Sequence, residues 1–208
     1  MIIGFAHVAY STPDMESAIR YWTKRGWTSI NEHFDISSSS EKWVYTHGKP
    51  TKHDIAILRG KPKIEILRHN SQIAAGVSRI KICDGYISLD VSDLVSEKSF
   101  FIDAIGFTSK NDVDLAIMRS VPSWNLNIKL ILSETKLEDN RLNIEGLSCL
   151  AFVSNDIHRD RQCLLNGGAR EISQVFETQL DGNRFKVVMC RTPNGNMLEL
   201  FEVSSDHD

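Results

Sequence analysis

The sequence predicts an α+β chain that contains three units of one layout: a short strand, an amphipathic helix and then further strands. The first observation is a similar opening in three places, HVAYSTPDMESAIRYWTKRGW at 7–27, YISLDVSDLVSEKSFFIDAIGF at 86–107 and CLAFVSNDIHRDRQCLLNGGA at 149–169. The second is an aspartate at the same place in each opening, where its carboxylate can cap a helix N-terminus. The third is a glycine near each helix end, as expected for a left-handed C′ residue. The three aspartates are Asp14, Asp93 and Asp156.

Alternating or apolar runs after each helix predict the remaining strands. These runs lie at 28–34, 53–58, 63–68, 115–119, 126–132, 171–179, 184–191 and 197–203. Polar segments at 69–80 and 134–145 join the units. We therefore expect a first βαβββ module at 1–70, a degenerate module-like unit at 84–133 and a third βαβββ module at 145–204.

Composition and charge argue against several classes of function. The 208 residues include 41% hydrophobic and 25% charged residues, which is typical of a globular protein. The formal net charge of -3 and the scattered basic residues argue against nucleic-acid binding. The sequence contains no apolar run long enough to cross a bilayer, no glycine-rich phosphate loop and no GxSxG motif. The four cysteines lie far apart without a CxxC pair, so we expect reduced thiols and a cytoplasmic location.

The last predicted strand carries a carboxylate in an otherwise apolar row. In RTPNGNMLELFEV, alternation places Glu199 on the same face as Met197, Phe201 and Val203. A strand edge that is open to water would explain this carboxylate, and so would a cavity that needs a charge. The preceding PNGN, at 193–196, is interpreted as a turn and nothing more.

Equivalent positions of the three units differ in their chemistry. The first strands present His7, Tyr86 and Cys149, and the last strands present Glu65, Lys129 and Glu199. His7 is expected to share a face with Phe5 and Ala9 and to look into the concave side of the sheet. A histidine and a carboxylate on such strands can bind a divalent metal together, but a catalytic site usually has about three protein ligands. A second unit therefore has to complete the site.

The opening HVAYSTPDMESAIRYWTKRGW and the ending RTPNGNMLELFE resemble the vicinal oxygen chelate superfamily, which includes glyoxalases, bleomycin-resistance proteins and extradiol dioxygenases. The likeness covers the first and third units, and the second unit only by layout. It implies that paired βαβββ modules form curved mixed sheets around a cup-shaped cavity. It also implies a divalent metal ion (zinc, iron, manganese or nickel), which is held by residues of two modules and stabilises an oxyanion-like intermediate.

Carried over by position, the resemblance implies that His7, Glu65 and Glu199 are metal ligands and that Glu199 is also the catalytic carboxylate. Cys149 stands where the family often has a histidine. A thiolate there would be an unusually soft ligand, and a neutral thiol would simply be a small core residue. His7 taken alone is also compatible with an ordinary core or surface histidine.

The sequence leaves the pairing of the three units open. Tyr86 and Lys129 do not fit a metal site, since a dication would repel the ammonium group. One arrangement pairs the first and third units around one cavity, with the second unit inserted between them. The other pairs the first two units and leaves the third to meet its copy in a homodimer. Ligand types favour the first arrangement, and chain adjacency favours the second.

The expected function is a metal-dependent enzyme that performs lyase, isomerase or dioxygenase chemistry on a small oxygen-rich molecule. Trp43, Tyr45 and His53 lie in or beside the loop that would rim the first module, so they are candidates for substrate binding. A homodimer is expected as the assembly. The alternatives are a resistance-type protein that sequesters a drug or metabolite without chemistry, and a metal-free enzyme with Glu199 as the base.

Overall fold

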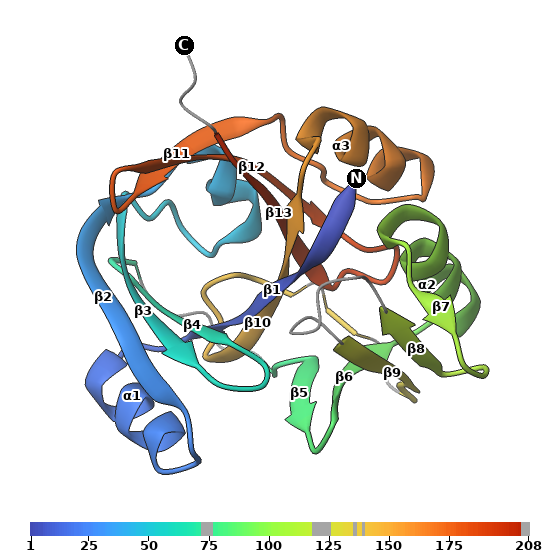
Figure 1. Cartoon of the computed structure of the whole chain (residues 1–208), viewed down its shortest axis with the longest axis horizontal. Coiled ribbons are helices and arrows are strands. Elements are labelled where there is room, and N and C mark those ends of the chain that lie inside the picture. Colours follow the sequence, from blue (N-terminus) through green and yellow to red (C-terminus); the bar gives the residue numbers. More distant parts are fainter. Residues whose placement is uncertain (72–76, 118–125, 135–136, 139, 205–208) are drawn as a thin grey trace.

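The computed structural model describes residues 1–71, 77–117, 126–134, 137–138 and 140–204, and its strands form two sheets (Figure 1). The first unit contains β1 (Ile2–Ser11), α1 (Met15–Thr23), β2 (Thr28–Ser37), the short 3₁₀-helix η1 (Ser40–Tyr45), β3 (Lys52–Arg59) and β4 (Ile64–His69). The second contains β5 (Ile80–Cys83), β6 (Tyr86–Val91), α2 (Leu94–Phe100), the π-helical turn η2 (Phe101–Ile105), β7 (Thr108–Ser109), β8 (Asp114–Ile117) and β9 (Leu126–Leu132). The third contains β10 (Gly146–Ser154), α3 (Ile157–Asn166), β11 (Phe176–Leu180), β12 (Asn183–Arg191) and β13 (Met197–Val203).

The larger sheet is shared by the first and third units. Its eight strands have the order β11-β12-β13-β10-β1-β4-β3-β2. β1 and β10 pair antiparallel at the centre, and each has the last strand of its own unit as a parallel neighbour. The sheet curls around its concave side (Figure 1). The predicted α+β fold, with βαβββ modules in a curved mixed sheet, is confirmed.

The second unit forms a separate sheet of five strands in the order β5-β6-β9-β8-β7. β6 pairs parallel with β9, as β1 pairs with β4, so the unit repeats the layout of the modules without joining their sheet. Its first strand, β5, falls at the end of the segment that was expected to be a linker. Within the part of the chain that the structure describes, no helix has both the length and the apolar character needed to cross a bilayer.

Each helix begins at the aspartate that the sequence predicts. The Asp14 carboxylate accepts a hydrogen bond from the Ser17 amide at 3.0 Å, and Asp156 accepts one from the Arg159 amide at 3.1 Å. Asp93 accepts from two amides at the start of α2. These contacts satisfy amide groups that have no partner inside the helix, which explains where the helices begin.

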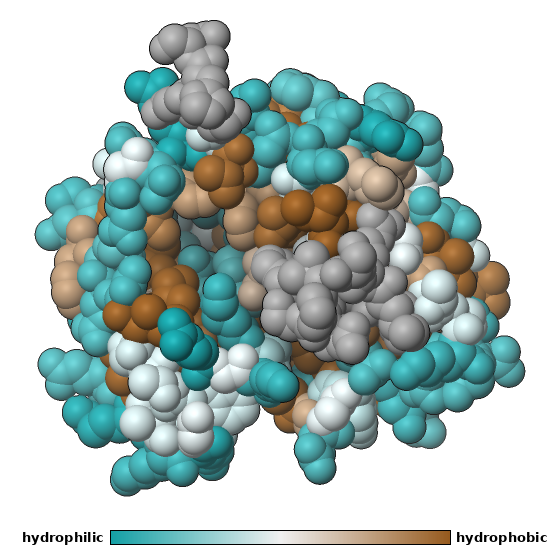
Figure 2. Space-filling model, in the orientation of Figure 1, coloured by the Kyte–Doolittle hydropathy of each residue, from teal (hydrophilic) through white to brown (hydrophobic). Residues whose placement is uncertain are grey.

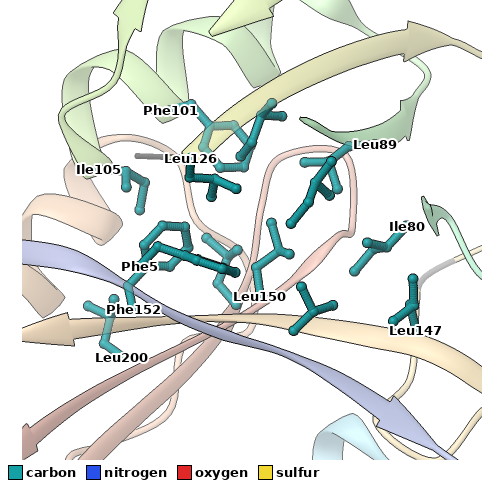
Figure 3. Packing of buried hydrophobic residues seen from close by; sticks show 14 of the residues in the cluster. Phe5, Ile80, Leu89, Phe101, Ile105, Leu126, Leu147, Leu150, Phe152 and Leu200 are labelled. Atoms are coloured by element: carbon teal, nitrogen blue, oxygen red, sulfur yellow. The ribbon is translucent and has the colours of Figure 1, made fainter. Parts of the chain in front are cut away.

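The main hydrophobic core lies between the convex face of the larger sheet and the second unit (Figure 3). Phe5 and Phe152 extend from the larger sheet toward Leu89 and Phe101 of the second unit. The Phe152 ring meets the Phe107 ring edge-on, with centroids 6.3 Å apart. The second unit therefore contributes to the same core as the two modules, and the concave side of the larger sheet is left for other contacts.

A buried polar network fastens the second unit to the turn before β13. The fully buried Glu97 carboxylate of α2 accepts hydrogen bonds from Thr192 Oγ1 at 2.7 Å, the Asn194 amide at 3.1 Å and Asn196 Nδ2 at 3.0 Å. Asn194 Oδ1 in turn accepts from the Asp93 amide at 2.7 Å. The interpretation of PNGN as a turn only is wrong, because its side chains hold two units together.

An irregularity in β1 decides which way His7 points. Phe5 pairs with Phe152 and His7 pairs with Ala151, so Ala6 is one extra residue and forms a β-bulge. Phe5 therefore lies in the main core, whereas His7 faces the concave side. The expectation that these two side chains share a face is wrong, because strict alternation ends at the bulge.

The two edges of the larger sheet meet through side chains. Asp181 lies in the turn between β11 and β12, and its carboxylate is 3.2 Å from His33 Nδ1 on β2. The same carboxylate accepts a hydrogen bond from Asn31 Nδ2 at 3.4 Å. These contacts join the first and third units on the side opposite the central β1–β10 pair, so the curled sheet encloses its concave face.

Candidate functional site

Three potential metal ligands gather on the concave face of the larger sheet. They are His7 on β1, Glu65 on β4 and Glu199 on β13, and one ligand atom from each lies within 4.8 Å of the others. Ligand atoms about 2.0–2.2 Å from a first-row metal ion are roughly 3–4 Å apart, so a small contraction would fit this set to an ion. The structure thus brings together the three side chains that the sequence comparison selected.

The His7 ring is held between two acidic residues and an aromatic ring. Its Nε2 atom is buried and lies 3.2 Å from Glu65 Oε2, within the range of an ion pair. Phe201 stacks on the other side of the imidazole, with centroids 6.2 Å apart. A buried imidazole nitrogen that converges with two carboxylates is a suitable donor set for a divalent metal ion.

The pKa shifts of this pair follow from its burial and its charges. Burial disfavours protonated His7, but the charges of Glu65 and Glu199 outweigh this effect and raise the pKa of the imidazole. Burial also disfavours the Glu65 carboxylate, and the attraction of His7 and Lys42 outweighs it, so that the pKa of Glu65 is well below its usual range. Glu65 therefore stays ionised at neutral pH and is a weak base.

Lys42 is a charged group of the site that sequence reasoning missed. Its Nζ atom lies 3.7 Å from Glu199 Oε1, and its side chain is only 18% exposed. The ammonium group enters the cup from η1, which Figure 1 shows within the ring of strands. A buried carboxylate needs a nearby positive charge or several hydrogen bonds, and Lys42 supplies this charge for Glu199.

η1 is anchored by contacts to distant parts of the chain. The Tyr45 hydroxyl donates to the carbonyl oxygens of Met189, at 2.8 Å, and Glu171, and the Tyr45 carbonyl accepts from the Leu142 amide at 2.8 Å. These partners belong to the third unit and to the segment before it. The position of Lys42 thus depends on long-range contacts that no local sequence pattern reveals.

The cluster lies in a cavity of about 460 Å³. Its wall is mainly apolar, with side chains from β3, β12 and β13 such as Ile55, Ile57, Phe185, Val187 and Phe201. Figure 2 shows the hollow in the left half of the molecule, with apolar side chains around it. A mostly apolar pocket of this size with a few convergent polar groups is typical of a small-molecule site.

The remaining positions of the repeat lie outside the ligand cluster. Cys149 is buried beside it, yet its sulfur contacts the Leu150 carbonyl oxygen at 3.7 Å and is not among the gathered ligand atoms of the described residues. Burial and the charge of Glu199 raise the pKa of the Cys149 thiol, which keeps it neutral. Tyr86 and Lys129 lie on the separate five-stranded sheet, where the ammonium group is 5.9 Å from the Tyr86 ring.

The three residues expected to bind substrate occupy different environments. His53 lines the cavity, with its Nδ1 atom 2.8 Å from Ser38 Oγ. Tyr45 lies in the core beneath η1, and Trp43 donates a hydrogen bond from Nε1 to the Pro50 carbonyl oxygen at 2.9 Å. Neither of these two aromatic residues lines the cavity.

A second cavity of about 600 Å³ adjoins the first at His53. Its charged groups pair with one another: Lys52 lies 3.2 Å from Asp35, and Arg68 lies 2.5 Å from Asp54. Because these side chains are paired with one another, few charged groups remain there to bind a ligand. The chemistry of the molecule is therefore concentrated in the smaller cavity, where carboxylates, an imidazole and an ammonium group converge.

Solved structures similar to this chain include three proteins. Glyoxalase I from Zea mays is 15% identical over 96% of this chain and 67% of that chain, with a TM-score of 0.43. Methylmalonyl-CoA epimerase from Mycobacterium tuberculosis is 12% identical over 99% of this chain and 91% of that chain, with a TM-score of 0.47. An integron cassette protein from the mobile metagenome of V. cholerae is 18% identical over 56% of this chain and 91% of that chain, with a TM-score of 0.40.

These three likenesses, at 12–18% identity and TM-scores of 0.40–0.47, concern the fold alone. No protein-family model matches the sequence, and no curated protein matches it. At such low identities and TM-scores, no reaction, substrate or metal carries over from the neighbours to this chain. What the chain can do therefore depends on its own cavity residues.

Proposed function

We propose that this protein is a divalent-metal-dependent enzyme that acts on a small oxygen-bearing molecule by lyase or isomerase chemistry. The observation that carries the proposal is the convergence of His7, Glu65 and Glu199 within 4.8 Å at one wall of a cavity of ligand size. Proton transfer next to a polarised oxygen is the step that such a site supports best.

The three side chains would hold the ion, and a divalent ion bound there supplies a Lewis acid for a substrate oxygen. His7 would bind through Nε2, which lies 3.2 Å from Glu65 Oε2. Glu65 remains ionised because its pKa is lowered. Glu199, which lies between apolar neighbours and Lys42, is the better-placed carboxylate to move a proton. The apolar wall excludes water from the reacting atoms.

Metal content of the purified protein tests the proposal. We expect about one equivalent of zinc, iron, manganese or nickel in the wild type, and loss of most of it in His7→Ala and Glu199→Gln. Matched controls are His158→Ala and Glu177→Gln, whose side chains are exposed on α3 and β11. Full retention of metal in both cavity variants would overturn the assignment of these ligands.

The position of Lys42 favours a second function, a protein that binds a small molecule in the cup without a metal. The ammonium group already balances one of the two carboxylates, and the His7–Glu65 pair can balance the other. This alternative predicts purified protein without metal and unchanged ligand binding in the presence of EDTA. Turnover of a bound ligand would contradict it.

A further inference from the structure

We infer that Lys42 anchors the ligand, and that the cavity takes a small carboxylate-bearing molecule with an apolar alkyl or aryl body. The inference rests on the proposed use of this cavity as the ligand site, and it names the class of molecule that the site recognises. It depends on three features: the N–H donors of Lys42 that no described residue accepts, the charge balance of the cavity and the chemistry of its walls.

Lys42 forms an ion pair with Glu199 but keeps N–H donors for a ligand. Its distance of 3.7 Å from Glu199 is too long for a hydrogen bond, and no described acidic side chain lies closer to it. An ammonium group carries three N–H donors, so at least two remain for other acceptors. Because the side chain lines the cavity, a ligand oxygen that enters the cup can reach these donors.

The charges that line the cavity favour an anion. Glu65 and Glu199 supply two negative charges, Lys42 and Lys63 supply two positive charges, and His7 is paired with Glu65. A divalent ion bound by both carboxylates would cancel their charges and leave both lysines uncompensated. With the ion bound, the cavity carries a net positive charge that attracts an anionic ligand. Without the ion, the N–H donors of Lys42 still face a cavity with mainly apolar walls.

The walls specify the rest of the ligand. Around the charged groups the lining is formed by aliphatic and aromatic side chains, among them Ile36, Ile57, Leu67, Leu180 and Phe185. A polar body would lose its hydration against these side chains and find few partners, since the uncharged polar side chains among the described lining residues are limited to Thr178, Gln179 and the histidines. The cavity thus fits a molecule with one anionic end at Lys42 and an apolar remainder against the walls.

Lys42 is also fixed in place before a ligand arrives. η1 is held at its C-terminal end by the hydrogen bonds of Tyr45, and by Arg141, which donates to the Thr46 carbonyl oxygen at 3.2 Å. A group positioned in this way loses less conformational entropy on binding than a lysine on a free loop. A lysine that merely balances Glu199 would not discriminate between charged and neutral ligands. The experiment therefore measures the preference for a charged ligand over a neutral one.

Binding of phenylacetate and phenylacetamide, measured by isothermal titration calorimetry, tests the inference, because the two probes share shape and differ in charge. We expect the wild type to prefer phenylacetate by at least about tenfold, the value of a charge-assisted hydrogen bond. Lys42→Met should lose this preference and keep its affinity for phenylacetamide. Lys42→Arg should retain the preference. Lys186→Met is the matched control, since Lys186 lies on β12 but does not line the cavity.

The inference is overturned if the wild type binds neither probe, if it shows no preference, or if the preference survives in Lys42→Met. Each titration is run with Mn²⁺ and again with EDTA, which separates this inference from the proposed function. Absence of Mn²⁺ binding together with a preference for phenylacetate in EDTA would contradict only the metal-dependent enzyme. Binding of Mn²⁺ without the preference would contradict only the role of Lys42.

Discussion

At the level of single residues, Lys42 and a metal ion would compete for the Glu199 carboxylate. The ammonium group lies 3.7 Å from the carboxylate that the ion needs. Two cations that share one carboxylate repel each other at short range in a partly buried place. The metal-free site is therefore stabilised by Lys42, and the metal-bound site has to tolerate it.

We expect Lys42→Met to bind Mn²⁺ or Zn²⁺ about tenfold more tightly than the wild type, because the competing charge is removed. Methionine keeps the length of the side chain and its apolar stem. Titration of metal-stripped protein with a competing chelator measures the change, with Lys186→Met as the control. Weaker metal binding in Lys42→Met would show that the ammonium group supports the ion instead.

Two buried histidines predict how stability depends on pH. Burial, with the charge of Lys42 nearby, lowers the pKa of His53 to about 3 and that of His69 to about 4, from 6.5. Below pH 6.5 the unfolded chain takes up protons that the folded protein refuses, so the free energy of unfolding falls as pH falls from about 6.5 toward 4. The slope is at most about 1.4 kcal/mol per pH unit for each histidine.

The His69→Gln variant should therefore show a shallower loss of stability between pH 7 and 5 than the wild type. Urea denaturation at several pH values measures this slope. His158→Gln, which changes an exposed histidine, should keep the slope of the wild type. Identical slopes in all three proteins would show that His69 is protonated in the folded state.

Part of the site could be predicted from the sequence because it follows the repeat. His7, Glu65 and Glu199 occupy equivalent positions on first and last strands, and the parallel pairs β1–β4 and β10–β13 place such positions side by side. Lys42 could not be found in this way, since it belongs to a loop in one unit only. Its place depends on Tyr45, whose partners lie far along the chain.

Among the helices and strands, too, the elements with local sequence signals were predicted and those that depend on distant contacts were not. Capping aspartates and alternating runs located the three helices and most strands, because their signals are local. β5 and η1 were not expected, and the polar role of the PNGN turn was not recognised. These features depend on contacts between units, which local patterns do not report.

Removal of the contact between α2 and the turn before β13 should lower the free energy of unfolding. Glu97→Ala removes an acceptor that serves Thr192, Asn194 and Asn196, and it leaves their donors buried without a partner. We expect a loss of about 3 kcal/mol or more in the free energy of unfolding. Chemical denaturation measures it.

A carboxylate removed from the surface is the matched comparison. Glu16→Ala breaks an exposed pair with Arg20, whose atoms are 3.5 Å apart, and it should cost less than about 1 kcal/mol. Equal effects of the two substitutions would mean that water replaces the lost carboxylate at Glu97.

For the whole molecule, the shared core implies that the three units unfold together. Phe101 of the second unit is fully buried in the cluster that also contains Phe5 and Phe152 of the larger sheet. Phe101→Ala should lower the free energy of unfolding by about 3–5 kcal/mol. It should also shift the midpoint of every probe by the same amount.

Tryptophan fluorescence and far-ultraviolet circular dichroism distinguish this outcome from separate unfolding. In a Trp124→Phe background the remaining tryptophans, Trp22, Trp27 and Trp43, all belong to the first unit, so their fluorescence reports on it, whereas circular dichroism reports on all strands and helices. Midpoints that separate in Phe101→Ala would show that the second unit unfolds independently. The whole fold class was predictable because every unit repeats one pattern, but the position of the second unit on the convex face was not.

The β-bulge at Ala6 has a consequence for how related chains should vary. An extra residue in a strand ordinarily turns every preceding side chain to the opposite face. Here the bulge absorbs it, so that Phe5 on one side of Ala6 faces the main core while His7 on the other side faces the cavity. Insertions and deletions among homologues should therefore be tolerated at Ala6, directly beside the proposed ligand His7, where a gap would otherwise be least expected.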